Sequence, residues 1–195
     1  MKTALKLAVF PLAAAAIVAC NEAPTGSAAR GDAELLVTAT TCFGLTPTGI
    51  VGVPGTGAQT GMTVFTGTPG DDVIFGTEGA DFIRGGAGND RICSLGGNDV
   101  LFGDEGNDRI QAGSGEDRIE GNNGNDLIEG GNGNDSIEGN FGNDDVQGNM
   151  GDDVVGGDPG QDIVRGGVGF DRCFDPDGPS TTFETCESIT FINFP

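Results

Sequence analysis

A nine-residue period organises most of this 195-residue chain. Residues 67–174 divide without a gap into twelve nonapeptides, which run from GTPGDDVIF to GGVGFDRCF. The fourth position of every unit is Gly and the sixth is Asp, while the eighth is aliphatic in eleven units and Cys173 in the last. Repeats of this length indicate a solenoid, in which each unit contacts only its neighbours.

The constant columns predict the local structure of each unit. A constant Gly marks backbone that needs a positive φ or a close approach, so the first half of the unit is expected to be a tight turn. The polar, aliphatic, polar trio around position eight predicts a short strand with one buried face. Since one unit cannot bury its aliphatic side chain alone, we predict an all-β fold. The expected architecture is a right-handed parallel β-roll with two nonapeptides per turn and capping segments at both ends.

Two units per turn place each position-six Asp above the Asp eighteen residues later. Strands lie about 5 Å apart, so these carboxylates repel one another unless a cation lies between successive turns. Calcium suits such a gap, because it takes six to eight oxygen ligands and the turns offer carbonyls beside the Asp side chains.

The units match the pattern GGxGxDxUx, and in this the chain resembles the RTX, or haemolysin-type, calcium-binding family. The resemblance implies a parallel β-roll that holds calcium between its loops, with carbonyls of the Gly-rich turns completing the shell. Two stacks of six turns enclose five gaps each, so we expect about ten calcium ions at most. The side-chain ligands that the resemblance implies are Asp72, Asp81, Asp90, Asp99, Asp108, Asp117, Asp126, Asp135, Asp144, Asp153, Asp162 and Asp171.

Some units depart from the pattern. Ser94 and Ala112 replace the first Gly of their units, and weaker sites are expected there because a side chain enters a turn with little room. Residues 34–66 contain degenerate units without the Asp and are predicted to cap the roll at its N-terminal end. The apolar segment 175–195 is predicted to supply a capping strand at the other end.

Composition excludes several function classes. The chain has no His, so it lacks an imidazole base and the HExxH zinc motif. Its formal net charge of -21 makes it a poor partner for nucleic acid. Disorder is an alternative for an acidic, Gly-rich chain, but it gives no reason for a fixed aliphatic column. A metal-free solenoid held by the Asn residues frequent at position five is another, which the unpaired Asp columns argue against.

The first twenty residues, MKTALKLAVFPLAAAAIVAC, have the charged start and short apolar core of an export signal. Ile17-Val18-Ala19-Cys20 resembles the lipobox of bacterial lipoproteins, which implies a signal peptide over 1–19 and a lipid anchor on Cys20. Residues 20–33 fit a flexible tether. An outer-membrane, cell-surface or extracellular location is expected; an ordinary signal peptide with an incidental Cys is the alternative.

The other cysteines are even in number, and an exported chain permits disulfides among them. Local distance favours Cys173 with Cys186, which leaves Cys42 to join Cys93. Zinc binding by the four thiols is an alternative, although no CxxC spacing occurs.

These observations predict calcium binding, calcium-induced folding and a structural or adhesive role at the cell surface, without enzymatic activity. One alternative is a calcium buffer or sensor for a partner; the sequence identifies no protein or glycan partner. Another is an accessory module of a secreted hydrolase, although residues 34–66 are too few for a catalytic domain and contain no GxSxG motif.

Overall fold

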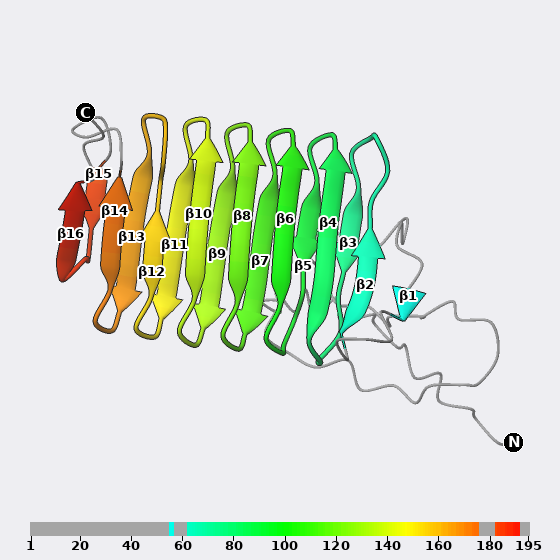
Figure 1. Cartoon of the computed structure of the whole chain (residues 1–195), viewed down its shortest axis with the longest axis horizontal. Coiled ribbons are helices and arrows are strands. Elements are labelled where there is room, and N and C mark those ends of the chain that lie inside the picture. Colours follow the sequence, from blue (N-terminus) through cyan, green and yellow to red (C-terminus); the bar gives the residue numbers. More distant parts are fainter. Residues whose placement is uncertain (1–54, 57–61, 176–181, 192–195) are drawn as a thin grey trace, which may run out of the picture.

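The computed structural model describes residues 55–56, 62–175 and 182–191, and every regular element among them is a β-strand (Figure 1). No helix in this part of the chain has the length and hydropathy that a membrane crossing needs. The expected signal peptide, the tether with Cys20, and Cys42 lie outside the described residues. The strands are β1 (Gly55–Thr56), β2 (Thr63–Thr66), β3 (Val73–Phe75), β4 (Asp81–Ala87), β5 (Arg91–Cys93), β6 (Val100–Glu105), β7 (Arg109–Ser114), β8 (Arg118–Asn123), β9 (Leu127–Asn132), β10 (Ser136–Phe141), β11 (Asp145–Met150), β12 (Val154–Gly156), β13 (Ile163–Val168), β14 (Arg172–Asp175), β15 (Thr182–Glu184) and β16 (Ser188–Phe191).

Two sheets form the walls of a solenoid, and consecutive strands alternate between them. The first sheet has nine strands in the order β1-β2-β4-β6-β8-β10-β12-β14-β16, and the second has seven in the order β15-β13-β11-β9-β7-β5-β3. All pairs are parallel except β1 with β2. Paired residues such as Ile83 and Leu101 are eighteen positions apart, so each turn contains two nonapeptides. The predicted all-β parallel roll is confirmed (Figure 1).

The position-eight side chains fill a thin core between the sheets. Phe65 of β2 extends this core toward the N-terminus at the position that pairs with Ile83. Burial of one such aliphatic side chain contributes about 1.5–3 kcal/mol, which a single unit cannot obtain alone. The position-eight residues, each at most 1 % exposed, are Ile74, Ile83, Ile92, Leu101, Ile110, Ile119, Ile128, Ile137, Val146, Val155, Val164 and Cys173.

The strands are longer than the predicted trio, and this part of the prediction is wrong. In the regular units a strand continues from position seven into position three of the next unit, as in β8 and β10. Pairing skips position one and resumes at positions two and three, where Asp104 pairs with Asn122. The turn is therefore confined to positions four to six.

A left-handed residue at position two explains how the strand bends without losing its partners. Asn and Asp tolerate a positive φ better than other non-Gly residues, and they share this position with Gly. Leu95 is the one large apolar residue in the set. The position-two residues with positive φ are Gly86, Leu95, Asp104, Gly113, Asn122, Gly131, Asn140, Asn149, Asp158 and Gly167.

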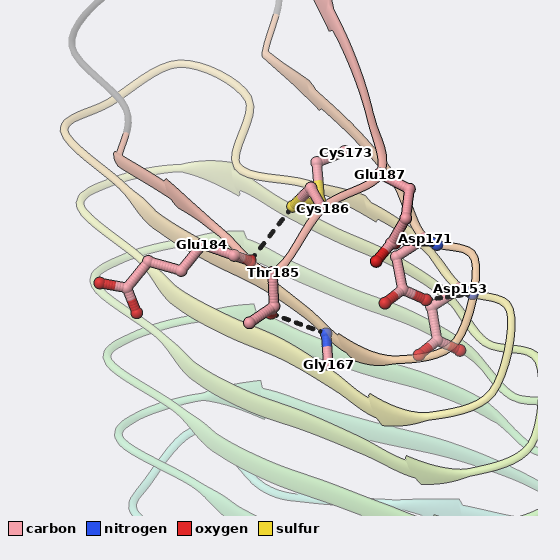
Figure 2. The surroundings of a disulfide bond; sticks show 8 residues. All are labelled: Asp153, Gly167, Asp171, Cys173, Glu184, Thr185, Cys186 and Glu187. Carbon is pink, nitrogen blue, oxygen red and sulfur yellow. Dashed lines mark hydrogen bonds between the residues drawn. A yellow bond between two sulfur atoms is a disulfide. The ribbon is translucent and has the colours of Figure 1, made fainter.

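The C-terminal segment adds two strands, although one capping strand was predicted. β15 pairs with β13 and β16 pairs with β14, so this segment continues both sheets. Cys173 and Cys186 form a disulfide with a Cα–Cα distance of 5.9 Å, the pairing that local distance favoured (Figure 2). Cys93 is disulfide-bonded as well, and its expected partner Cys42 lies outside the described residues.

Candidate metal-binding site

The twelve predicted Asp ligands all lie inside the turns, and none is more than 5 % exposed. They form two columns, because successive units alternate between the sheets. One column precedes the strands of the second sheet and comprises Asp72, Asp90, Asp108, Asp126, Asp144 and Asp162. The other begins or precedes the strands of the first sheet and comprises Asp81, Asp99, Asp117, Asp135, Asp153 and Asp171.

In ten of the twelve units, all except those of Asp72 and Asp81, one oxygen of the carboxylate binds the preceding turn. Oδ1 of Asp108 accepts a hydrogen bond from the backbone N–H of Asp90 at 2.8 Å, and the same bond recurs at every eighteen-residue step of both columns. At the C-terminal end the N–H of Asp171 donates instead to Glu187 Oε2 at 2.7 Å (Figure 2). The position-six Asp therefore fixes the stacking distance between turns, a role that the sequence did not predict.

In nine units the other carboxylate oxygen is buried and has no donor among the residues that the structure describes. A buried oxygen that gives up water and gains no hydrogen bond is costly, and more so when it is charged. The residues whose Oδ2 atoms are in this state are Asp90, Asp99, Asp108, Asp117, Asp126, Asp135, Asp144, Asp153 and Asp171.

In seven of these nine units, Oδ2 lies close to a further acceptor across the first Gly of the unit; the units of Asp99 and Asp117 begin with Ser94 and Ala112 instead. A Cβ atom built on Gly139 would lie 2.5 Å from Asp144 Oδ2 and 2.9 Å from the carbonyl oxygen of Gly157, which belongs to the next turn. Position one therefore needs Gly for space, because any side chain would displace these two oxygens. The prediction that this Gly lies in the turn is wrong, since Gly139 lies within β10.

Ten of the twelve position-six carboxyls have a raised pKa and so bind protons more tightly than ordinary Asp. Burial raises the pKa from 3.8 to about 6 for Asp126, about 7 for Asp108 and about 8 for Asp135. Neighbouring carboxylates add to the rise at Asp108 and Asp135, whereas the N–H donor from the turn before opposes it. A site with this preference needs a positive charge, either a proton or a cation, next to Oδ2.

The donor set fits calcium. All of its atoms are oxygens, from carboxylates and backbone carbonyls, and calcium binds such hard ligands. Among the described residues, no three His, Cys, Asp or Glu side chains form a group that could hold a metal ion by themselves. The Asp residues would therefore hold calcium together with carbonyls such as that of Gly157, and the ion would supply the missing positive charge between turns.

An Asn column at position five runs beside the Asp columns. The side-chain oxygen of Asn107 accepts the backbone N–H of Asn125 at 2.7 Å, and Asn125 accepts that of Asn143 at 2.8 Å. The Asn column that was considered as the basis of a metal-free solenoid is thus present. It binds N–H groups only and leaves the Asp Oδ2 atoms without a donor, so it accompanies a cation and does not replace one.

Ser94 and Ala112 are buried within the roll and lie outside the turn in which they were predicted. The Ser94 hydroxyl donates to the carbonyl oxygen of Ala112 at 2.6 Å, so the two unusual units are stacked on each other. Burial raises the pKa of Asp99 to about 7, and the hydrogen bond that its Oδ1 accepts from the backbone N–H of Asp81 opposes that rise. Because their side chains occupy space that Gly leaves open, weaker calcium binding beside Ser94 and Ala112 stays a prediction.

Comparison with known families agrees with this geometry. The sequence profile of the RTX calcium-binding nonapeptide repeat matches residues 66–101, 94–128, 102–137, 120–155 and 138–173, which together span more than half of the chain. No curated protein matches the chain. RTX nonapeptide repeats bind Ca²⁺ in a β-roll, and the proteins that contain them are typically exported. Both the repeat pattern and the fold therefore assign this chain to the RTX calcium-binding nonapeptide-repeat family.

Proposed function

We propose that calcium folds this protein after export, and that the folded roll is a structural or adhesive module of the cell envelope or surface. One observation supports the folding step above all others: nine buried Asp Oδ2 atoms have no hydrogen-bond donor. With the carboxyls ionised, the packed turns bring uncompensated negative charges together. A chain with a net charge of -21 then favours the expanded state until cations compensate the columns.

Folding of the roll is expected to depend on the calcium concentration. Extracellular calcium modules have dissociation constants of about 10⁻⁴–10⁻³ M, so such sites are empty at cytosolic calcium and fill outside the cell. Binding to the folded state alone adds its free energy to folding. Each turn contacts its two neighbours, so an ordered turn provides half of the next site and filling is expected to be cooperative.

Calcium titration monitored by circular dichroism tests the folding step. We expect little β-structure in EDTA at neutral pH and a steep gain of β-signal as calcium rises toward about 1 mM. Magnesium is the control, because it demands a tighter octahedral shell and should produce a much smaller gain. Spectra that are the same in EDTA and in calcium would contradict the proposal.

A lipid anchor on Cys20 is the proposed route to the cell surface. The apolar run before Cys20 and the sequence Ile17-Val18-Ala19-Cys20 support it. Mass spectrometry of the membrane fraction is expected to find an acyl modification on the N-terminal Cys20 of the processed chain. The variant Cys20→Ser should accumulate as an unprocessed precursor; processing of this variant at the wild-type rate would exclude lipoprotein maturation.

Exposed apolar side chains on the later turns support a contact role for the folded roll. Met150 and Val168 are 57 % and 72 % exposed and are paired in register on β11 and β13. Phe170 lies just after Val168, in the bend that follows β13, and is 79 % exposed. Cells that lack the protein are expected to lose calcium-dependent aggregation, and cells with Phe170→Ser to lose part of it. Aggregation unaffected by the deletion would exclude the adhesive role.

A further inference from the structure

The first two repeat units hold their position-six carboxylates differently from the nine units in which the Asp Oδ2 atom has no donor. Asp72 Oδ2 accepts the backbone N–H of Thr68 at 2.5 Å and lies 3.0 Å from the Thr68 hydroxyl. Asp81 Oδ2 accepts the backbone N–H of Thr77 at 2.6 Å and lies 3.2 Å from its hydroxyl. In both units the oxygen that lacks a donor elsewhere is therefore satisfied by the protein itself.

The residue at position two accounts for this difference. Thr68 and Thr77 are absent from the set of position-two residues with positive φ, in keeping with the high cost of that conformation for a β-branched side chain. Their backbone instead directs the N–H toward the Asp four residues later, and the hydroxyl adds a second donor. Hydrogen bonds of this kind stabilise the charged form of a carboxylate, which a cation does in the other units.

An extra apolar cluster stabilises the same end of the roll. Phe75 and Cys93 of the second sheet are 2 % and 0 % exposed, and they pack with Leu95 and Val73 in a cluster separate from the main core. Farther along this sheet, the equivalent position-nine residues are polar and partly exposed, as at Glu129. The N-terminal turns therefore bury apolar side chains on both faces of the second sheet, whereas the position-nine residues farther along this sheet are polar.

From these two observations we propose that Asp72 and Asp81 are not calcium ligands, and that Thr68 and Thr77 take the place of the cation. Strands β2 to β5 then form two turns that are stable without calcium, and calcium binding begins with Asp90 and Asp99. This inference rests on the proposed calcium-driven folding of the other units. Each column retains four gaps instead of five, so the expected capacity falls to about eight ions.

The consequence is a direction of folding. The two preformed turns present the open edges of β4 and β5, which pair with β6 and β7 in the complete roll. The next turn can then order on this edge when calcium arrives, without the cost of nucleating a solenoid turn from the disordered chain.

Calcium counting on the full chain tests the ligand assignment. We compare the double variant Asp72→Asn with Asp81→Asn against the matched pair Asp108→Asn with Asp117→Asn, measuring bound calcium per chain at saturation. The first pair is expected to bind as many ions as the wild type, and the second to lose at least two. Equal losses in both pairs would overturn the inference, while a wild-type chain that binds no calcium would instead overturn the proposed function.

Hydrogen exchange in EDTA tests whether the two turns formed by β2 to β5 are folded without calcium. Amides of β2 to β5 are expected to stay protected while those of β6 to β14 exchange freely. Replacing Thr68 and Thr77 by Gly removes the hydroxyls and permits the left-handed bend. This variant should lose protection in EDTA and bind about two more calcium ions than the wild type. Uniform exchange across the wild-type roll in EDTA, or an unchanged ion count in the Gly variant, would contradict the inference.

Discussion

Acidification to about pH 4 is expected to fold the calcium-free chain, whereas the same chain at about pH 8 in EDTA stays largely unfolded. Burial raises the pKa of Asp90, Asp117 and Asp153 to about 6, and of Asp99 and Asp144 to about 7. A pKa that is higher in the folded state than the unfolded value of 3.8 means that the folded state binds the proton more tightly. Each such group contributes full stability below 3.8, and this contribution is lost as pH rises through its folded-state pKa. The loss is therefore concentrated between about pH 4 and pH 8.

Circular dichroism in EDTA as a function of pH measures this effect, with a parallel series in saturating calcium as the control. Protons and calcium compete for the same Oδ2 atoms, so the midpoint of the calcium titration should move to higher concentration as the pH is lowered. In saturating calcium the folded signal should persist at pH 8. A calcium-free chain whose folded fraction rises from pH 4 to pH 8 would reverse the predicted sign and refute the assignment of proton-binding columns.

Gly124→Ala is expected to be among the most damaging single methyl additions in the central roll. Gly124 has a φ of +136°, a region that disfavours an L-residue by about 1–2 kcal/mol. The new Cβ would also overlap the carbonyl oxygen of Gly106 and lie 2.5 Å from its carbonyl carbon. Because both atoms belong to the backbone of the adjacent turn, relief requires the turns to separate. We expect a loss of about 2–5 kcal/mol in the free energy of unfolding, measured by denaturant titration in saturating calcium.

Gly70→Ala is the matched control, since Gly70 occupies the same position in the first unit. A Cβ there meets nothing closer than the Thr68 hydroxyl at 4.0 Å, and the backbone does not have the positive φ of Gly124. Its effect should stay within about 0.5 kcal/mol. Similar losses for the two variants would show that the difference between these turns has no energetic consequence.

The nine-residue period and the constant Gly, Asp and aliphatic positions could be predicted from the sequence because they are local and repeated. The aliphatic residue at position eight of each unit, such as Ile119, can be buried only when its strand stacks on the strands eighteen residues away and packs against the opposite sheet. That requirement alone predicts parallel sheets, two units per turn and stacked Asp columns. Strand length was missed, because it depends on the left-handed bend at position two, where Gly, Asn, Asp and Leu95 occur without an obvious pattern.

The roles of individual side chains could not be predicted from the sequence. In the sequence, Thr68 and Thr77 differ from the position-two residues of the other units only in residue type. Nothing in the sequence indicates that they bind Asp72 and Asp81. Glu187 lies sixteen residues after Asp171, outside the eighteen-residue register, so its part in ending the column is visible only when the turns are stacked. Side chains act here across the gap between turns, and a contact across that gap has no local signature.

The acidic, glycine-rich repeat thus specifies a calcium-binding roll by periodicity, since residues at a constant spacing must meet when the strands pair. The arrangement in space adds a division of roles between the two oxygens of the position-six Asp in every unit after the first two. One oxygen accepts an N–H from the preceding turn, while the other is buried and, in nine units, has no donor. That division depends on which atoms the neighbouring turn presents, a property of packed backbone and not of residue order. It explains why a net charge of -21 is compatible with a compact fold once cations lie between the turns.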